Sequence, residues 1–422
     1  MNPSQPSSTI FDQLRPSSIA GKRAQLALLA LAETLAMGPW FAASAVLPQL
    51  RTEWALTQSQ SAWLTMTVQL GFVLGAFGSA VINLPDRVSI PRLFAWSAIL
   101  AAAANGAIPL LDAGPELAMV LRFLTGVALA GVYPPAMKLV ATWCREDRGL
   151  GIGLLIGALT LGSAFPHLLN ALPFLGESGM PPWRPVLLVT SGMTAVAGLI
   201  AFGFIRPGPY LAGTAPFDWK FVGRALTYRP TRLVNLGYLG HMWELYAMWT
   251  WAPVFLLESY LRSGLSPAAG RLAGFAVVAV GAVSCFAAGA VADRVGRTTI
   301  SAWSMAVSGT CALLAGLLAG APVALTVLCL IWGISVVSDS AQFSAAASEL
   351  TDPRYVGTTL AVQTSMGFLL TMVTIRLVPV LVDRFGWVAG FALLAPGPLA
   401  GVGAMLRLRR LPEAVKMASG NR

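Results

Sequence analysis

Glu33–Trp40 reads ETLAMGPW, and Glu244–Trp251 reads ELYAMWTW. Both stretches follow the pattern E-x-x-A-M-x-x-W, they stand half a chain length apart, and each lies inside a long apolar run. A carboxylate is costly inside a bilayer, so an intramembrane acid is read as a functional residue. The repeat indicates a duplicated membrane protein with a polar centre. We predict that both glutamates face one shared aqueous chamber.

The composition indicates a membrane setting. Hydrophobic residues make up 56% of the chain and charged residues 11%, whereas a soluble domain has about 25% charged residues. The mean hydropathy is +0.70. The net charge of +10 does not predict a nucleic-acid partner, because the bases fall in short connections between apolar runs. We therefore expect lipid, and no nucleic acid, around this chain.

The few cysteines and histidines predict no catalytic or metal chemistry. The four cysteines form no close pair, and they show no metal-ligand spacing. We expect them to pack as small core residues, with no metal and no cofactor. With two histidines in the chain, no set of nucleophile and base is evident, so we expect no enzyme.

The apolar runs divide the chain into regular units. A membrane crossing needs about 20 mostly apolar residues, and the runs that meet this length are 24–50, 60–83, 92–112, 116–140, 149–173, 184–205, 233–259, 266–291, 299–319, 322–347, 356–381 and 386–407. The sequence thus predicts an all-α polytopic membrane protein with twelve transmembrane helices in two pseudo-symmetric six-helix bundles. Its predicted parts are a tail (1–23), a first bundle (24–205), a linker (206–232), a second bundle (233–407) and a second tail (408–422).

The positions of the bases predict the orientation. Most of the 28 Lys and Arg residues fall on one side of the membrane if the amino terminus is placed inside, as the positive-inside rule requires. We therefore expect both termini in the cytoplasm and the protein in the inner (plasma) membrane. We also expect a monomer to be the functional unit.

One loop resembles a known signature. Gly289–Arg297 reads GAVADRVGR, which is similar to the cytoplasmic G-x-x-x-D-R-x-G-R motif of the major facilitator superfamily. A weaker copy, LPDRVSIPR, occupies Leu84–Arg92. Arg122–Gly126 (RFLTG) is similar to the R-x-x-x-G pattern of proton-coupled members. With twelve spans divided into two sixes, the resemblance covers nearly the whole chain.

The resemblance implies a fold and a gate. In this family spans 1, 4, 7 and 10 line the central cavity. An Asp at a helix end can pair with Arg and with the positive N-terminus of a neighbouring helix. Such pairs would join the two halves in one state and separate in the other. The gating role is expected at Asp86, Arg87, Gly289, Asp293, Arg294, Gly296 and Arg297.

Acidic and basic residues occupy the spans that the resemblance assigns to the cavity. Glu33 and Glu244 are expected near the midplane from the helical rise. Arg122 on span 4 can reach either of them from the outer side and offset the cost of burial. We predict that Glu33 and Glu244 bind protons and that Arg122 is their exchangeable partner. Alternatively, they form a static pair that only joins helices. His241, three residues before Glu244, is a proton-relay candidate or a packed core residue.

Further candidates concern the cargo. Asp339 and Gln342 share a face of span 10, where they would bind substrate or close the inner gate. Trp40 and Trp251 can stack on an organic substrate, although helix packing would also account for them. Tyr133 on span 4 completes the set of cavity candidates.

The function that follows is secondary active transport. The chain has no G-x-x-x-x-G-K-[ST] motif, so we expect an ion gradient, most plausibly of protons, to drive a small solute by alternating access. The cargo is either a cationic or amphipathic compound exported by proton antiport, or a small anion taken up by proton symport. A non-transporting membrane sensor is the alternative of a different class.

Overall fold

The computed structural model describes residues 19–144, 147–172, 182–211, 222–223, 226–352 and 355–421, and the side chains of residues 19, 20, 58 and 86 are outside this description. The predicted tail 1–23 is therefore described only from residue 19, and the predicted linker 206–232 only in part. All regular secondary structure in the described ranges is helical.

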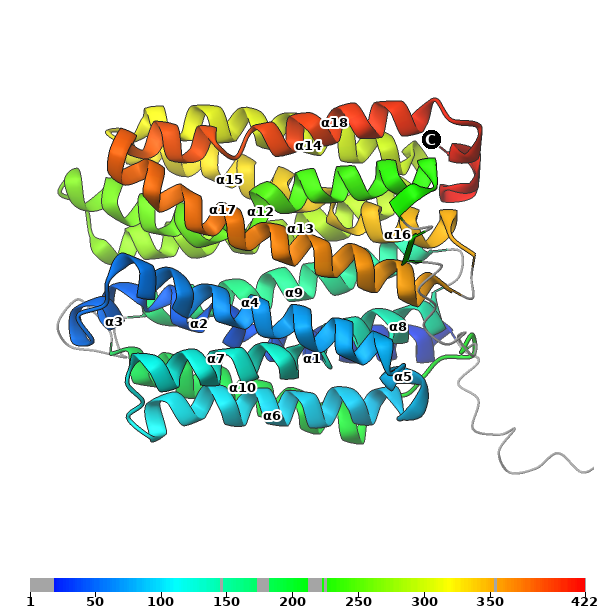
Figure 1. The fold of residues 1–422 in the computed structure, drawn as a ribbon, viewed down its shortest axis with the longest axis horizontal. Helices are drawn as coiled ribbons and strands as arrows, with labels where there is room; N and C mark the ends of the chain where they lie inside the picture. Colours follow the sequence, from blue (N-terminus) through cyan, green and yellow to red (C-terminus); the bar gives the residue numbers. More distant parts are fainter. Residues whose placement is uncertain are drawn as a thin grey trace, which may run out of the picture.

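The helices form two layers, which Figure 1 shows one above the other. The first layer contains α1 (Ile19–Ala36), α2 (Gly38–Ala45), α3 (Leu47–Glu53), α4 (Gln58–Val81), α5 (Leu84–Arg87), α6 (Ile90–Leu110), α7 (Pro115–Leu129), α8 (Tyr133–Trp143), α9 (Arg148–Ala171) and α10 (Trp183–Gly203). The second contains α12 (Arg229–Arg262), α13 (Pro267–Val295), α14 (Arg297–Ala315), η2 (Gly316–Leu318), α15 (Pro322–Ser338), α16 (Ser340–Leu350), α17 (Val356–Ala392), α18 (Pro396–Arg409), η4 (Pro412–Lys416) and η5 (Ala418–Gly420). We call these layers the first and second bundles.

The described helices account for the twelve predicted crossings. Ten helical stretches are long and apolar enough to span a membrane. One of them, Val356–Arg409, contains two crossings because the chain turns at Gly386, which has a φ of 79°. The helix α12 adds the remaining crossing with 34 residues, although its polar residues dilute its hydropathy. The predicted fold class is confirmed.

Breaks interrupt the first, fourth and tenth crossings within the described residues. The first crossing breaks at Met37, between α1 and α2, and the fourth breaks between α7 and α8. Proline lies in the first turn of α2 and of α8, where its missing N–H is tolerated. The tenth crossing breaks at Asp339, between α15 and α16. Irregular backbone at membrane depth is tolerated where it is buried in protein or lines a cavity.

The bundles meet along two seams. Helix α9 packs along α13, and α4 packs along α17, as Figure 1 also shows. At the first seam a Cβ atom added to Gly153 would lie 2.8 Å from the carbonyl oxygen of Cys285, and one added to Gly157 would lie 2.7 Å from that of Ala282. The missing side chains let the two backbones approach closely.

The two ends of the molecule carry different elements. The end where α5 and the α13–α14 connection lie, at the right of Figure 1, is called the α5 end. The opposite end, where α3 lies, is called the α3 end. The chain enters α1 and leaves α18 at the α5 end.

Candidate functional site

Glu33 lies on α1 and has an unusual environment. Its side chain is fully buried, and neither carboxylate oxygen has a hydrogen-bond partner in the described part of the chain. An ionised carboxylate buried without a cation or donor is very costly, and such a group takes up a proton instead. The geometry therefore favours a proton-bound Glu33 in this conformation.

Glu244 lies at the matching position on α12, but its surroundings differ. The Ser308 hydroxyl donates to Oε2 at 2.8 Å, and the Trp332 indole N–H donates to Oε1 at 2.7 Å. Both donors belong to the second bundle, on α14 and α15. Glu244 therefore joins helices within one bundle.

Arg122 does not pair with either glutamate. Its buried guanidinium donates to the backbone carbonyls of Pro39, Trp40 (2.6 Å) and Leu64 (3.5 Å). These contacts join α7 to α2 and α4. The predicted Arg122–glutamate pair is therefore wrong for this structure, because the depth estimate gave the height of each residue but not the face of the helix on which it lies.

His241 contacts Asp339 rather than Glu244. The distance between His241 Nδ1 and Asp339 Oδ1 is 2.9 Å, and both side chains are buried. The other ring nitrogen of His241 has no hydrogen-bond partner among the described residues. The contact joins α12 to the break between α15 and α16, so two predicted candidates form one buried polar pair.

Two cavities lie between the bundles. The central one, of about 30 Å³, has room for little more than water. Its lining includes Tyr133, Tyr238, Tyr246, Trp249, Ser340 and Phe368. The larger one, of about 390 Å³, has the size of a small-molecule site. Tyr133 and Thr364 line both, so the cavities are neighbours.

The larger cavity lies towards the α5 end. The lining residues come from α4, α5, α8 and α9 of the first bundle and from α16 and α17 of the second. They include the bases Lys138 and Arg148, and none of the described lining residues is acidic. Apolar side chains make up most of the rest. The described lining therefore combines apolar walls with two basic side chains.

Glu33 and Glu244 are not among the lining residues of either cavity. Neither of these two cavities therefore brings Glu33 and Glu244 together. The two acids differ because the second bundle provides a hydroxyl and an indole donor to Glu244, while Glu33 has neither. Tyr133, which lines both cavities, lies within electrostatic range of Glu33.

An aromatic cluster occupies the interface between the bundles. The ring centroid of Trp40 lies 4.9 Å from that of Phe72, 5.1 Å from that of Phe368 and 5.9 Å from that of Tyr246. The last two residues belong to the second bundle. Close by, the Thr371 hydroxyl donates to Gln69 Oε1 at 3.1 Å across the α4–α17 seam. Trp40, Phe72, Tyr246 and Phe368 are called the aromatic cluster.

Of the other predicted cavity residues, Tyr133 lines both cavities, whereas Trp251 and Gln342 line neither. Trp251 donates its indole N–H to the Ile375 carbonyl at 3.1 Å and lines neither cavity. Gln342 accepts a hydrogen bond from Arg297 at 3.1 Å, so its position fits the gate alternative better than the substrate alternative.

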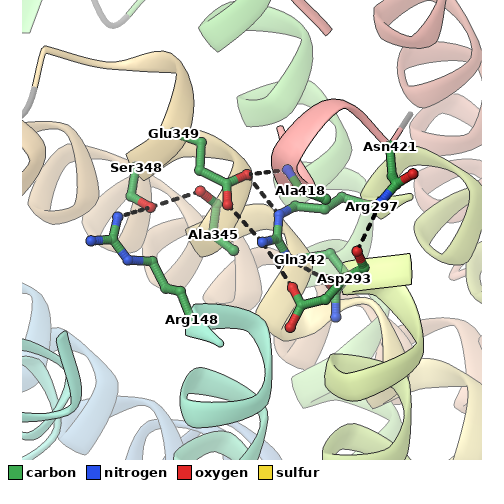
Figure 2. Close-up of polar contacts among 9 residues, drawn as sticks. All are labelled: Arg148, Asp293, Arg297, Gln342, Ala345, Ser348, Glu349, Ala418 and Asn421. Atoms are coloured by element: carbon green, nitrogen blue, oxygen red, sulfur yellow. Dashed lines mark hydrogen bonds and ion pairs between the residues drawn. The ribbon is translucent and has the colours of Figure 1, made fainter. Parts of the chain in front are cut away.

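The second copy of the loop motif forms a charged network, shown in Figure 2. Arg297 donates to both oxygens of Glu349, at 2.6 and 2.7 Å, and to Asp293 at 3.1 Å. Gly296 has a φ of 108°, a conformation that favours glycine. Gly289 faces the backbone of Gly149 on α9 closely enough to exclude a Cβ atom.

The network also touches the first bundle. The Asp293 carboxylate faces the first turn of α9: a Cβ atom added to Gly149 would clash with it, and the backbone N–H of Leu150 is near enough to stabilise its charge. Arg148 Nη1 donates to the Ser348 hydroxyl at 3.3 Å. Carboxylates are stabilised at helix N-termini, so Asp293 holds the two bundles together here.

Among the described side chains, Arg87 and Arg294 of the motif make no contact with this network. Arg87 and Arg294 are exposed, and the Asp86 side chain is outside the described residues. Sequence reasoning missed Glu349 and Arg148, although each is a charged residue at the end of a long apolar run. It also missed Tyr246 and Phe368, because aromatic residues are too common in such runs to signal an interface.

Comparisons with known proteins concern the family and the fold. The model of the Major Facilitator Superfamily matches residues 29–373. The niacin transporter NiaP of Acinetobacter baylyi is 24% identical over 246 residues, which cover 50% of this chain and 55% of that protein. The chain thus matches about half the length of this curated relative.

Solved structures share the fold. The proton:xylose symporter XylE, bound to 6-bromo-6-deoxy-D-glucose, has a TM-score of 0.72 and 13% identity, with coverage of 92% of this chain and 96% of that one. A bacterial homologue of the human lysosomal transporter Spinster, in an inward-facing and unoccupied conformation, has a TM-score of 0.63 and 17% identity, with coverage of 93% and 95%. At these identities the likeness concerns the fold.

Proposed function

Because this chain belongs to the major facilitator superfamily and is therefore a multi-pass membrane transporter rather than an enzyme, we propose that it carries a small organic anion together with protons by alternating access. The observation that supports the cargo class is the larger cavity. Its described lining includes Lys138 and Arg148 and no acid. A cationic cargo would meet like charge there, and an anion would meet opposite charge.

The apolar remainder of the lining limits the anion further. A cavity of about 390 Å³ with mostly apolar walls favours a compact organic body over a strongly hydrated inorganic ion. A small aromatic carboxylate satisfies both requirements. The relative named as a niacin transporter handles a molecule of this type. The alternative, export of a cationic compound, has no acidic group in the described cavity lining to support it.

Proton coupling is assigned to Glu33. Its buried carboxyl has no hydrogen-bond partner among the described residues, so it holds a proton until movement of the bundles brings water or a cation to it. His241, which contacts Asp339 at 2.9 Å, keeps the proton-relay role as a candidate. Arg122 keeps a supporting role, because its donors are engaged by backbone carbonyls.

Alternating access would use the two seams. The aromatic cluster closes the path towards the α3 end, while the larger cavity lies towards the α5 end. We propose that the protein lies in the inner membrane. By the positive-inside rule, the α5 end, the linker and both termini would then face the cytoplasm. Rocking of the bundles would separate Asp293 from α9 and open the α5 end, and the return movement would rejoin them there and open the α3 end. A monomer contains every part of this cycle.

A flux assay tests the cargo class. The purified protein is reconstituted in liposomes, and uptake of labelled nicotinate, benzoate and the cation tetraphenylphosphonium is measured with and without an inward proton gradient. We expect gradient-driven accumulation of the two carboxylates and none of the cation. Arg148→Gln should reduce carboxylate uptake at least 10-fold, whereas Arg92→Gln, at an exposed position, should not. Gradient-driven flux of the cation alone would overturn the proposal.

A further inference from the structure

The last described residues of the chain fold back onto the charged network at the α5 end, as Figure 2 shows for Ala418 and Asn421. We call Leu411–Asn421 the tail segment; it contains the short turns η4 and η5. Met417 is 0% exposed and belongs to the same apolar core as the membrane helices. A polar extension with a fully buried methionine is anchored by packing as well as by hydrogen bonds.

Two hydrogen bonds connect the tail segment to the network. The backbone N–H of Ala418 donates to Glu349 Oε2 at 3.1 Å, the same oxygen that accepts from Arg297 Nε at 2.7 Å. The side-chain amide of Asn421 donates to the backbone carbonyl of Asp293 at 3.0 Å. The tail segment therefore contacts both acidic residues that bind Arg297.

The backbone of the tail segment is held in an unfavourable conformation. Ala418, Ser419 and Gly420 have φ values of 45°, 55° and 103°. Residues with a Cβ atom rarely adopt the left-handed region, and they stay there only where surrounding contacts hold them. The contacts with Glu349 and Asp293 are such contacts, so the turn and the network depend on each other.

The network that the tail segment contacts also joins the bundles. Asp293 binds the first turn of α9, and Arg148 on α9 binds Ser348, which precedes Glu349. Any movement that separates α9 from α13 at the α5 end must disturb these contacts. A segment that fixes Glu349 and the Asp293 backbone therefore favours the joined arrangement.

We propose that the tail segment is a latch that stabilises the arrangement in which Asp293 binds α9, and that its release raises the fraction of molecules with a separated α5 end. The latch rests on the alternating-access part of the proposed function, but it concerns only the ratio of two conformations. It requires neither an anionic cargo nor proton coupling.

The test is a distance measurement across the α5 end. Spin labels are placed at Phe204 and Val291, which are exposed on the first and second bundles, after replacement of the four buried native cysteines by alanine. Distance distributions are recorded by double electron–electron resonance without substrate. Ending the chain at Arg410 should raise the ratio of long to short distances roughly 10- to 100-fold, as expected for loss of a hydrogen bond to a charged group.

Single substitutions provide the same test if the shortened chain does not fold. Asn421→Ala removes one hydrogen bond and should raise the ratio roughly 2- to 5-fold. Val415→Ala, on an exposed side chain of the same segment, should leave it unchanged. If both distances are observed but their ratio changes neither in the shortened chain nor in Asn421→Ala, the latch is overturned and alternating access is retained. If every variant shows the same single distance, with and without added nicotinate, both the latch and alternating access are overturned.

Discussion

The Nδ1 atom of His241 lies 2.9 Å from a carboxylate oxygen of Asp339, where the tenth crossing changes from α15 to α16. Both side chains are buried, so neither can exchange its partner for water. A broken helix inside a membrane needs its polar groups satisfied within the protein. The pair therefore connects α12 to the one acidic break in the described crossings.

Substitution of one partner of this pair should be more harmful than substitution of both. Asp339→Asn or His241→Gln alone leaves the other group buried without its partner, which is expected to lower the free energy of unfolding by about 3 kcal/mol. The double variant should lose about 1–3 kcal/mol less than the sum of the single losses. Chemical denaturation in detergent measures all three. Strictly additive losses would show that the two groups act independently.

Glu33 and Glu244 should respond differently to the same substitution. Glu33→Gln removes no hydrogen bond and no charge from the proton-bound form, so its effect on unfolding free energy should stay within about 0.5 kcal/mol. Glu244→Gln should cost about 1–3 kcal/mol, because its amide group cannot accept from both Ser308 and Trp332. Melting curves of the purified variants give the comparison.

Proton-driven transport should be impaired more by Glu33→Gln than by Glu244→Gln, which is the reverse of their effects on stability. Glu33→Gln should abolish gradient-driven accumulation of nicotinate but keep exchange of labelled for unlabelled nicotinate, because exchange requires no net proton movement. Glu244→Gln should keep both accumulation and exchange, although less of the protein should be folded and active. Accumulation by Glu33→Gln at the unaltered rate would remove Glu33 from the coupling role.

Composition and apolar length predicted most of the fold. The twelve crossings were found because each run is long enough to span a bilayer, and the division at Gly386 falls where the last two runs were separated. The breaks at Met37 and Asp339 were not predicted. Proline and glycine allow a break, but neighbouring helices decide whether it forms.

The site was predicted less completely than the fold. The repeat located Glu33 and Glu244 at matching buried positions, and the loop motif located Asp293 and Arg297 in one network. Partners were missed because depth along a helix says nothing about which neighbour it faces. Arg122 meets backbone carbonyls instead of an acid for this reason. Glu349 and the tail segment required knowledge of where α16 and α18 end.

The aromatic cluster should be needed to keep the α3 end closed. Trp40→Ala leaves a space among Phe72, Tyr246 and Phe368, and truncation of a buried Trp lowers stability by about 3–5 kcal/mol. A cysteine at Thr364, which lines both cavities, should then react faster with a membrane-impermeant thiol reagent added from the α3 side. Trp303→Ala, at a side chain that is 70% exposed, is the control. Equal labelling rates in the two variants would show that the cluster is no barrier.

The α9–α13 seam should tolerate no side chain at Gly157. A Cβ atom there would lie 2.7 Å from the Ala282 carbonyl oxygen, and neither backbone can move without parting the bundles. Gly157→Leu should therefore reduce nicotinate flux at least 10-fold, with Gly157→Ala intermediate. Gly192→Leu is the matched control, because nothing lies within 4 Å of a Cβ atom added to Gly192 on α10. If Gly157→Leu folds and transports at the rate of the Gly192→Leu control, the close approach of α9 and α13 is not required in any step of the cycle. If flux falls while the melting temperatures of Gly157→Ala and the control agree, the seam acts in the conformational change rather than in folding.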